Sequence, residues 1–167
     1  GDYDVDGITS TVILRRALEL LGGDVGHFIP ERLTDGYGLQ PNTIDRLHAE
    51  GVKLIVSVDC GIRGAEAAVR ARDLGVDLII TDHHEFDAAR LPQAVAIVHP
   101  RLERHEGTAA QRHEGIETRN PEPGTRNPYP FPDLCGAGVA FKLAWQFAKV
   151  HTGSERVPEV FKKLLLD

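Results

Sequence analysis

The chain has 167 residues, of which 41% are hydrophobic and 26% charged, the balance expected of one globular domain. This composition excludes collagen-like, disulfide-rich and wholly disordered proteins, and no apolar run approaches the roughly 18 residues that a membrane span needs. With 25 acidic and 19 basic residues the net charge is −6, which argues against a protein that coats nucleic acid non-specifically.

The first half of the chain alternates between helical and strand patterns. Apolar residues at helical spacing predict a helix over 8–22, and a short apolar run predicts a strand over 25–29. Asn42 is the expected N-cap of a helix that ends near Glu50. Continuous apolar runs predict buried strands over 53–58, 78–81 and 95–98, and an alanine-rich helix over 62–74 separates the first two. The alternation predicts an α/β fold with three layers, in which helices cover both faces of a parallel sheet.

The segment 103–127 interrupts this pattern with polar sequence and two internal repeats, Arg-His-Glu-Gly and Thr-Arg-Asn-Pro. It has few apolar residues to bury, so we expect a disordered loop inserted into the domain. His105 and His113 could bind a metal there, but a duplicated surface loop is the favoured interpretation, because no regular element would fix their geometry. Two helices are then expected, over 134–148 and 157–166.

The ends of the chain and its cysteines indicate its context. The sequence has no methionine, opens at Gly1 directly before a run of aspartates, and stops at Asp167 inside an expected helix. We therefore expect a partial domain, cut at both ends. Cys60 and Cys135 are too few for a disulfide framework and indicate a reducing, cytoplasmic compartment.

Three aspartates, Asp2, Asp4 and Asp6, alternate with other residues just before the first expected helix. Alternate residues of an extended segment point the same way, so the three carboxylates are expected to converge, and a divalent cation would relieve their repulsion. An EF-hand calcium loop is excluded, because the glutamate it requires is replaced by Ile13. An acidic turn that caps the helix is an equally good interpretation of this cluster alone.

Two further polar clusters follow neighbouring expected strands. Asp59 ends one strand, where it could also cap the helix expected from Ile62, and Asp82-His83-His84 ends the next. Ligands of open α/β sheets bind at the carboxyl ends of parallel strands, so these side chains are expected to meet there. Mixed carboxylate and imidazole groups indicate two divalent metals that share a carboxylate, a centre suited to in-line displacement at phosphorus.

These motifs, in this order, resemble the DHH phosphoesterase superfamily, which is named for the Asp-His-His triplet. The likeness is closest to its RecJ-type single-stranded-DNA-specific exonucleases, which further stretches match, at 29–32, 35–39, 99–101, 129–131 and 134–143. The resemblance covers nearly the whole chain apart from 103–127. It implies that residues 1–167 are a partial DHH catalytic domain, which lacks a strand and a histidine before Gly1 and a metal-binding aspartate after Asp167.

The resemblance also implies a two-metal site for Mn²⁺ or Mg²⁺. Asp4 and Asp6 match metal ligands of the family. Asp59 matches the carboxylate that bridges both metals, and His83 matches the metal-binding histidine. Cys60, beside Asp59, is expected to be a buried thiol and not a ligand.

Further residues are expected around these ligands. His84 matches the histidine that faces the substrate, as a second ligand or a phosphate contact, so His84 and Asp59 are the expected catalytic residues. Asp82 is expected to orient the two histidines, and Asp2 to lie outside the direct ligand set. Arg32 is expected to clamp a substrate phosphate, with a solvated surface arginine as the alternative.

The function implied by the resemblance is metal-dependent hydrolysis of single-stranded DNA in the 5′-to-3′ direction, in recombination and repair. Expected partners are single-stranded DNA and a single-strand-binding protein or helicase, with the protein itself a monomer. One alternative is a DHH phosphoesterase for small substrates such as nanoRNA, cyclic dinucleotides or pyrophosphate. The other is a catalytically silent relative, and the isolated piece is itself expected to be inactive.

Overall fold

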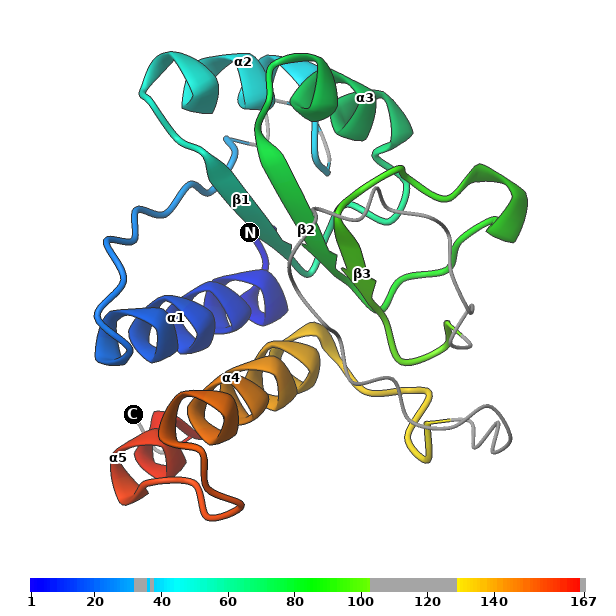
Figure 1. Cartoon of the computed structure of the whole chain (residues 1–167). Helices are drawn as coiled ribbons and strands as arrows, with labels where there is room; N and C mark the ends of the chain where they lie inside the picture. The colour runs from blue at the N-terminus through cyan, green and yellow to red at the C-terminus, as the bar shows by residue number, and fades with distance from the viewer. Residues whose placement is uncertain (32–35, 37, 103–128, 166–167) are drawn as a thin grey trace.

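Three parallel strands form the centre of the structure, a computed structural model that describes residues 1–31, 36, 38–102 and 129–165. They are β1 (Leu54–Val58), β2 (Asp77–Thr81) and β3 (Ala96–Val98), in the spatial order β1-β2-β3 (Figure 1). Val58 pairs with Thr81 and Thr81 with Val98, so the strands end in register. The three residues that follow the strands are therefore brought to one edge of the sheet.

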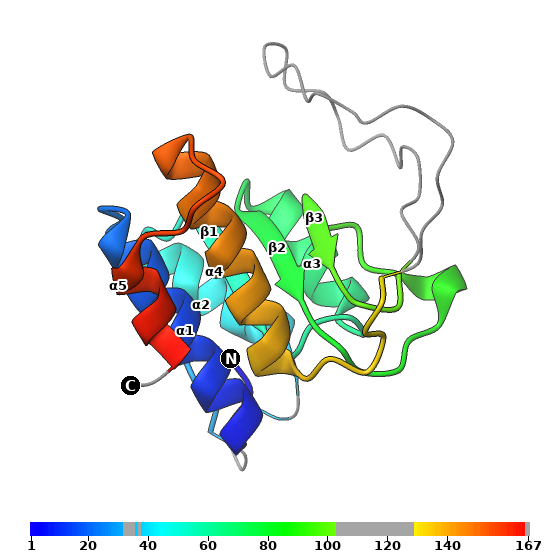
Figure 2. The same ribbon diagram turned by 90° about the horizontal axis from the view of Figure 1, so that it is seen from below.

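Helices cover both faces of this sheet. On one face lie α2 (Pro41–Ala49) and α3 (Ala65–Asp73), and on the other lie α1 (Val5–Leu20), α4 (Gly136–Thr152) and the short α5 (Glu159–Lys162) (Figures 1 and 2). Single 3₁₀ turns occupy Ala88–Arg90 and Lys163–Leu165. The arrangement confirms the predicted three-layer α/β fold. None of the described helices is long and apolar enough to cross a membrane.

Each layer of helices is held by its own apolar cluster. Small residues allow α1 and α4 to approach closely, and C-terminal residues close the cluster, which comprises Ile13, Ala17, Ala140, Ala144, Ala148, Val157, Phe161 and Leu164. The opposite cluster joins α2 and α3 to the sheet through Ile44, Ile55, Ala67, Ala68, Ala71, Val76, Leu78 and Ile80. Burial of these side chains supplies the main driving force for the fold.

Several predicted boundaries are wrong. The first helix begins at Val5 rather than at residue 8, so Asp6 lies inside its first turn. Gln40, not Asn42, is the N-cap of α2, because Pro41 occupies the first helical position. The helix predicted over 62–74 begins only at Ala65, after a turn. The last predicted helix forms as the short α5 followed by a 3₁₀ turn, and Pro158 is the N-cap of α5.

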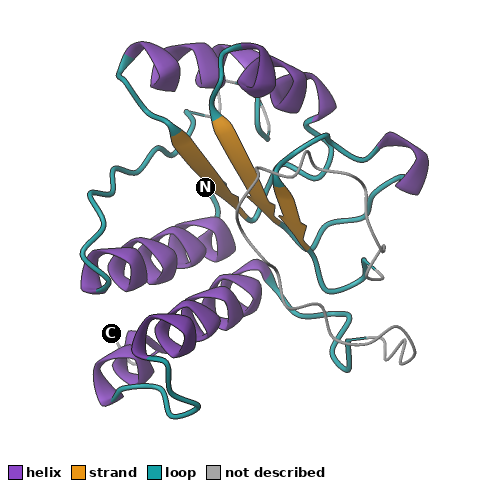
Figure 3. Ribbon diagram, in the orientation of Figure 1, coloured by secondary structure: helices purple, strands orange, loops and turns teal. Residues whose placement is uncertain are grey.

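The strand predicted over 25–29 does not form. Residues 24–31 join no sheet among the described residues and run as an irregular connection between α1 and the second layer, teal in Figure 3. The backbone nitrogen of Gly1 donates a hydrogen bond to the carbonyl of Phe28 at 2.8 Å, so Gly1 lies beside this stretch. A short apolar run becomes a strand only where a neighbouring edge pairs with it.

Candidate metal centre

Asp59 stands directly after β1, at the edge where the three strands end. Its backbone has a φ of 59°, in the left-handed region that non-glycine residues seldom adopt. Its amide donates to the Thr81 carbonyl at 2.9 Å, which extends the β1–β2 ladder by one residue. The sheet therefore fixes Asp59 in a strained conformation, a feature common at functional sites.

The Asp59 carboxylate is buried with no hydrogen bond from a described residue to offset its loss of hydration. Asp59 is 1% exposed, and neither of its carboxylate oxygens accepts such a bond. His83 Nε2 lies 3.0 Å from Asp59 Oδ1, but this contact lacks hydrogen-bond geometry. Burial, with the negative charges of Asp6 and Asp4, raises the pKa of Asp59 to about 7. A cation coordinated by these oxygens would offset the cost, so the residues fit a metal.

Two histidines complete a possible metal-binding group with Asp59. One ligand atom each from Asp59, His83 and His84 lie within 4.8 Å of one another. The predicted convergence of Asp59 with the Asp-His-His triplet is therefore present in the structure. It follows from the register of β1 and β2, which places residues 59 and 82 side by side.

Asp6 reaches the same place from the other layer. Its two carboxylate oxygens accept hydrogen bonds from the amides of Gly136 and Ala137, each at 2.7 Å, in the first turn of α4. Its Oδ2 lies 3.4 Å from His83 Nε2. The helix dipole of α4 favours a negative charge at this point, so α4 holds the Asp6 side chain beside the histidine.

Asp4 and Asp2 are placed differently from the expectation. Asp4 is the exposed N-cap of α1 and accepts from the amide of Gly7 at 2.9 Å. Asp2 is buried and accepts from the amide of Tyr3 at 2.7 Å. The predicted extended segment is wrong, because the helix begins at Val5 and removes the alternation of the three aspartates. Asp4 caps α1 through its Oδ1, and Asp6 faces His83.

Asp82 holds the histidine pair. Its Oδ1 accepts hydrogen bonds from the backbone amides of His83 and His84 and contacts His84 Nδ1 at 2.7 Å. Burial alone would raise the pKa of Asp82, but bonds from the amides of Ile62 and His84, and from the His84 ring, outweigh it and lower the pKa. Burial likewise opposes the charge on His84, yet the bond to Asp82 raises the pKa of the imidazole.

Asp82 also caps the turn after β1. Its Oδ2 accepts a hydrogen bond from the amide of Ile62 at 2.9 Å, and this is the capping role that the sequence had suggested for Asp59. Asp59 is thereby left free of helix capping. Cys60 is a buried free thiol, and burial raises its pKa to about 12, which disfavours a thiolate ligand.

The comparisons with known proteins agree with this geometry. The model of the DHH family, N-terminal domain, matches residues 1–166. The chain belongs to the DHH family.

The relatives of this DHH domain are named single-stranded-DNA-specific exonuclease RecJ. That of Bacillus subtilis is 40% identical over 144 residues, which are 86% of this chain and 15% of the relative. That of Escherichia coli is 45% identical over 103 residues, 61% of this chain and 18% of the relative. That of Thermus thermophilus is 35% identical over an alignment of 173 positions, which covers 95% of this chain and 24% of the relative. The DHH domain thus spans less than a quarter of the length of these proteins.

Two solved structures resemble the DHH domain. An exonuclease RecJ bound to manganese has a TM-score of 0.68 at 34% identity and covers 98% of this chain and 35% of its own. RecJ of Thermus thermophilus in complex with Mn²⁺ has a TM-score of 0.64 at 31% identity and covers 98% of this chain and 19% of its own.

Sequence reasoning did not assign three site residues of the DHH domain. His99 follows β3 and contacts the carbonyl of His84 through Nε2 at 2.9 Å. Arg101 contacts Glu85, the residue after His84. Gly136 lets α4 start against the buried carboxylate, since a Cβ there would lie 2.4 Å from Asp59 Oδ1. The sequence did hold one signal for His99. This residue directly follows the third strand, as Asp59 and Asp82 follow the first two.

Other expected residues lie outside the described part of the chain. Arg32, the expected phosphate clamp, is one of them. The expected insertion 103–127, with His105 and His113, is another.

Proposed function

We propose that this DHH domain is the catalytic core of a metal-dependent exonuclease that hydrolyses single-stranded DNA from the 5′ end, in DNA recombination and repair. The observation that carries the proposal is the buried Asp59 carboxylate, which has no hydrogen-bond partner among the described residues and lies 3.0 Å from His83. The names of the RecJ relatives support the substrate, and the two manganese-bound RecJ structures support the metal.

In this proposal Asp4, Asp6, Asp59 and His83 would hold the two metal ions. Carboxylates suit Mg²⁺ and Mn²⁺ alike, whereas the imidazole of His83 favours Mn²⁺. When bound, the metal pair supplies a water of lowered pKa and positive charge opposite the phosphodiester oxygens. Two backbone amides in the first turn of α4 donate hydrogen bonds to Asp6 and restrain its side chain, so the carboxylate needs little rearrangement to bind a metal.

His84 is proposed to contact the substrate phosphate. Its Nδ1 faces Asp82 Oδ1 at 2.7 Å, so the bond to Asp82 leaves Nε2 available. The raised pKa keeps a proton on both ring nitrogens to a higher pH than usual, and Nε2–H would donate to a phosphate or leaving oxygen. Arg32 is proposed as a further phosphate contact, and a single-strand-binding protein or helicase as a partner of the full-length protein.

The proposal is tested with the full-length protein and end-labelled oligonucleotides in Mn²⁺. We expect single strands to be digested from the 5′ end and duplexes to be spared. Asp59→Asn should lower the rate by more than about 100-fold, the most that the outer partners of metal ligands usually cost. Asp24→Asn is the control, because Asp24 is exposed and follows the C-terminal end of α1, whereas Asp6 lies in the first turn of that helix.

Two results would contradict the proposal. Equal rates of digestion for Asp59→Asn and the unaltered protein would show that the active site does not lie at this centre. Faster hydrolysis of short dinucleotides than of long single strands would instead support the small-substrate alternative.

A further inference from the structure

We propose that Tyr129 and Phe131 form a stacking platform for unpaired bases of a single strand that enters the metal centre. The proposal deepens the proposed function and rests on it for the identity of the strand. The two residues belong to a segment, 129–135, that leads into α4 and that we call the aromatic loop.

The two rings are unusual in their exposure. Phe131 is 63% and Tyr129 36% exposed, and their ring centroids lie 6.3 Å apart in an edge-to-face arrangement. The other large hydrophobic side chains that the described residues expose are all aliphatic. Tyr3, Phe28, Phe86, Phe141, Trp145, Phe147 and Phe161, the remaining described aromatics, are at least partly buried. Among the described residues, exposed aromatic area is therefore concentrated on this one loop.

The aromatic loop is linked to the metal centre through its middle and through its C-terminal end. Arg101 Nε donates to the carbonyl of Pro132 at 3.3 Å, and its Nη2 contacts Asp133 at 2.7 Å. The same guanidinium bonds to Glu85, which directly follows His84. At its other end the loop enters α4 through Gly136, whose amide bonds to Asp6. Phe131 thus stands five residues before a residue packed on Asp59.

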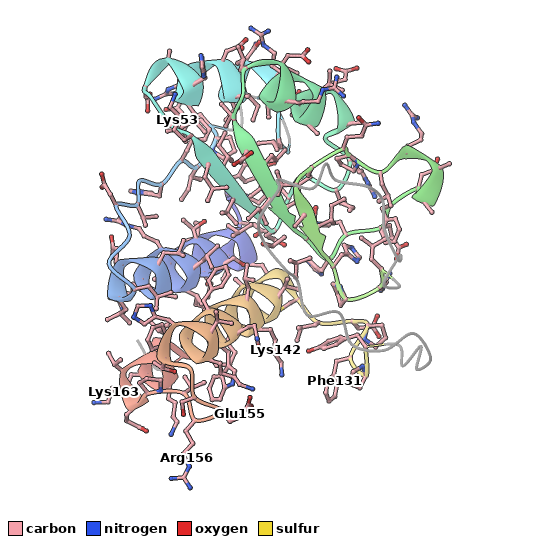
Figure 4. All side chains as sticks on the ribbon, in the orientation of Figure 1. Lys53, Phe131, Lys142, Glu155, Arg156 and Lys163 are labelled. Carbon is pink, nitrogen blue, oxygen red and sulfur yellow. The ribbon has the colours of Figure 1, made fainter. Side chains whose placement is uncertain are left out.

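The chemistry of this surface suits single-stranded nucleic acid. Aromatic rings stack on any base, because every base has a π face, and only an unpaired strand can offer that face. The nearby carboxylates of Glu85 and Asp133 are both paired with Arg101, which limits their repulsion of phosphates. Lys142, exposed on α4 and without an ion pair to a described residue, is available for a phosphate (Figure 4).

The test compares Phe131→Leu with Phe131→Trp in the full-length protein. Leucine keeps an apolar side chain but removes the ring face, whereas tryptophan restores it. With a single-stranded oligonucleotide that contains 2-aminopurine, we expect Phe131→Leu to weaken binding about tenfold and to reduce quenching of the base. Phe131→Trp should bind normally. KM should rise with Phe131→Leu while kcat stays within about twofold, and Val150→Ala, at another exposed position, should change neither.

The outcomes separate the platform from the proposed function. If the protein digests single strands but Phe131→Leu leaves KM and quenching unchanged, the platform is refuted and the function stands. If quenching depends on Phe131 but no strand is digested, the platform stands and the function is refuted. Loss of a protein partner, with unchanged oligonucleotide affinity, would also refute the platform and assign the loop to protein docking.

Discussion

Asp59 concentrates three energetic costs in one residue. Its backbone is left-handed, its carboxylate is almost fully buried, and its oxygens lack hydrogen bonds from described residues. A structural aspartate would be expected to cap a turn, which is the role that Asp82 performs here. Such costs persist only where the surrounding structure imposes them, and a bound cation would convert them into ligand pre-organisation.

The raised pKa of Asp59 predicts the pH dependence of metal binding. With a pKa of about 7 the carboxyl is largely protonated below that pH, and a cation must displace the proton. Affinity for Mn²⁺ should therefore weaken by up to about tenfold per pH unit below about pH 7. Calorimetry across that range measures it, and an affinity that stays constant down to about pH 5 would contradict the assignment.

Gly136 should be intolerant of a side chain. An added Cβ would lie 2.4 Å from Asp59 Oδ1 and 2.9 Å from Asp59 Cβ, so Gly136→Ala must displace either Asp59 or α4. We expect Mn²⁺ affinity to fall about 10- to 100-fold, as for other residues that orient metal ligands.

Gly138→Ala is the matched control for that experiment. Its added Cβ would lie 2.5 Å from Leu134 Cδ1 and 2.6 Å from Leu134 Cγ, so the Leu134 side chain must shift, but no atom of Asp59 is among the three nearest atoms. Alanine favours the helix by about 1 kcal/mol relative to glycine, which offsets part of that cost in stability. Equal Mn²⁺ affinities for the two variants would show that the close approach at Gly136 is unimportant.

At the scale of elements, the turn after β3 supports the histidine pair. His99 Nδ1 accepts from the amide of Arg101 at 3.1 Å, so the proton resides on Nε2, which donates to the carbonyl of His84 at 2.9 Å. Burial lowers the pKa of His99 and keeps this neutral tautomer. The turn therefore fixes the backbone that carries His84.

Loss of this support should slow the chemical step. His99→Leu removes the donor to His84, and we expect kcat to fall about tenfold, with KM for the oligonucleotide nearly unchanged. His99→Gln offers an amide donor at the same distance along the side chain and should recover most of the rate. If both variants lose the same activity, the hydrogen bond to His84 is not what positions it.

The elements themselves were largely predictable, and their ends were not. Continuous apolar runs predict the buried strands, and the bounds of β1 and β2 lie within one residue of the prediction. The predicted start of α1 was too late. Asp4 is the N-cap, because its side chain accepts a hydrogen bond from the amide of Gly7, and Asp6 therefore lies within the helix. The strand at 25–29 was mispredicted because local sequence does not reveal whether a sheet edge is available.

At the scale of the molecule, the centre is assembled between two layers. Asp59, His83 and His84 come from the sheet edge, while Asp6 comes from α1 and is held by α4. The sequence motifs predicted that the sheet residues would meet, because parallel strands end together. The contribution of Gly136 and Ala137 depends on a contact between residues some 130 positions apart, which no local pattern contains.

The packing of α1 on α4 should therefore affect metal binding as well as stability. Ala17 is fully buried between these helices, and Ala17→Leu should overpack the cluster and cost about 1–3 kcal/mol. Because α1 carries Asp6, the variant should also bind Mn²⁺ more weakly. Ala71→Leu overpacks the opposite layer and should lower only the melting temperature. Equal Mn²⁺ affinities for both variants would argue against coupling between the helix pair and the centre.

The most direct test of the central claim is the number of Mn²⁺ ions that the full-length protein binds at this centre. Titration calorimetry should find two sites in the unaltered protein and in Asp24→Asn. Asp59→Asn should lose both, because the resemblance to the DHH family implies that the two ions share this carboxylate. Two sites of unchanged affinity in Asp59→Asn would contradict the account.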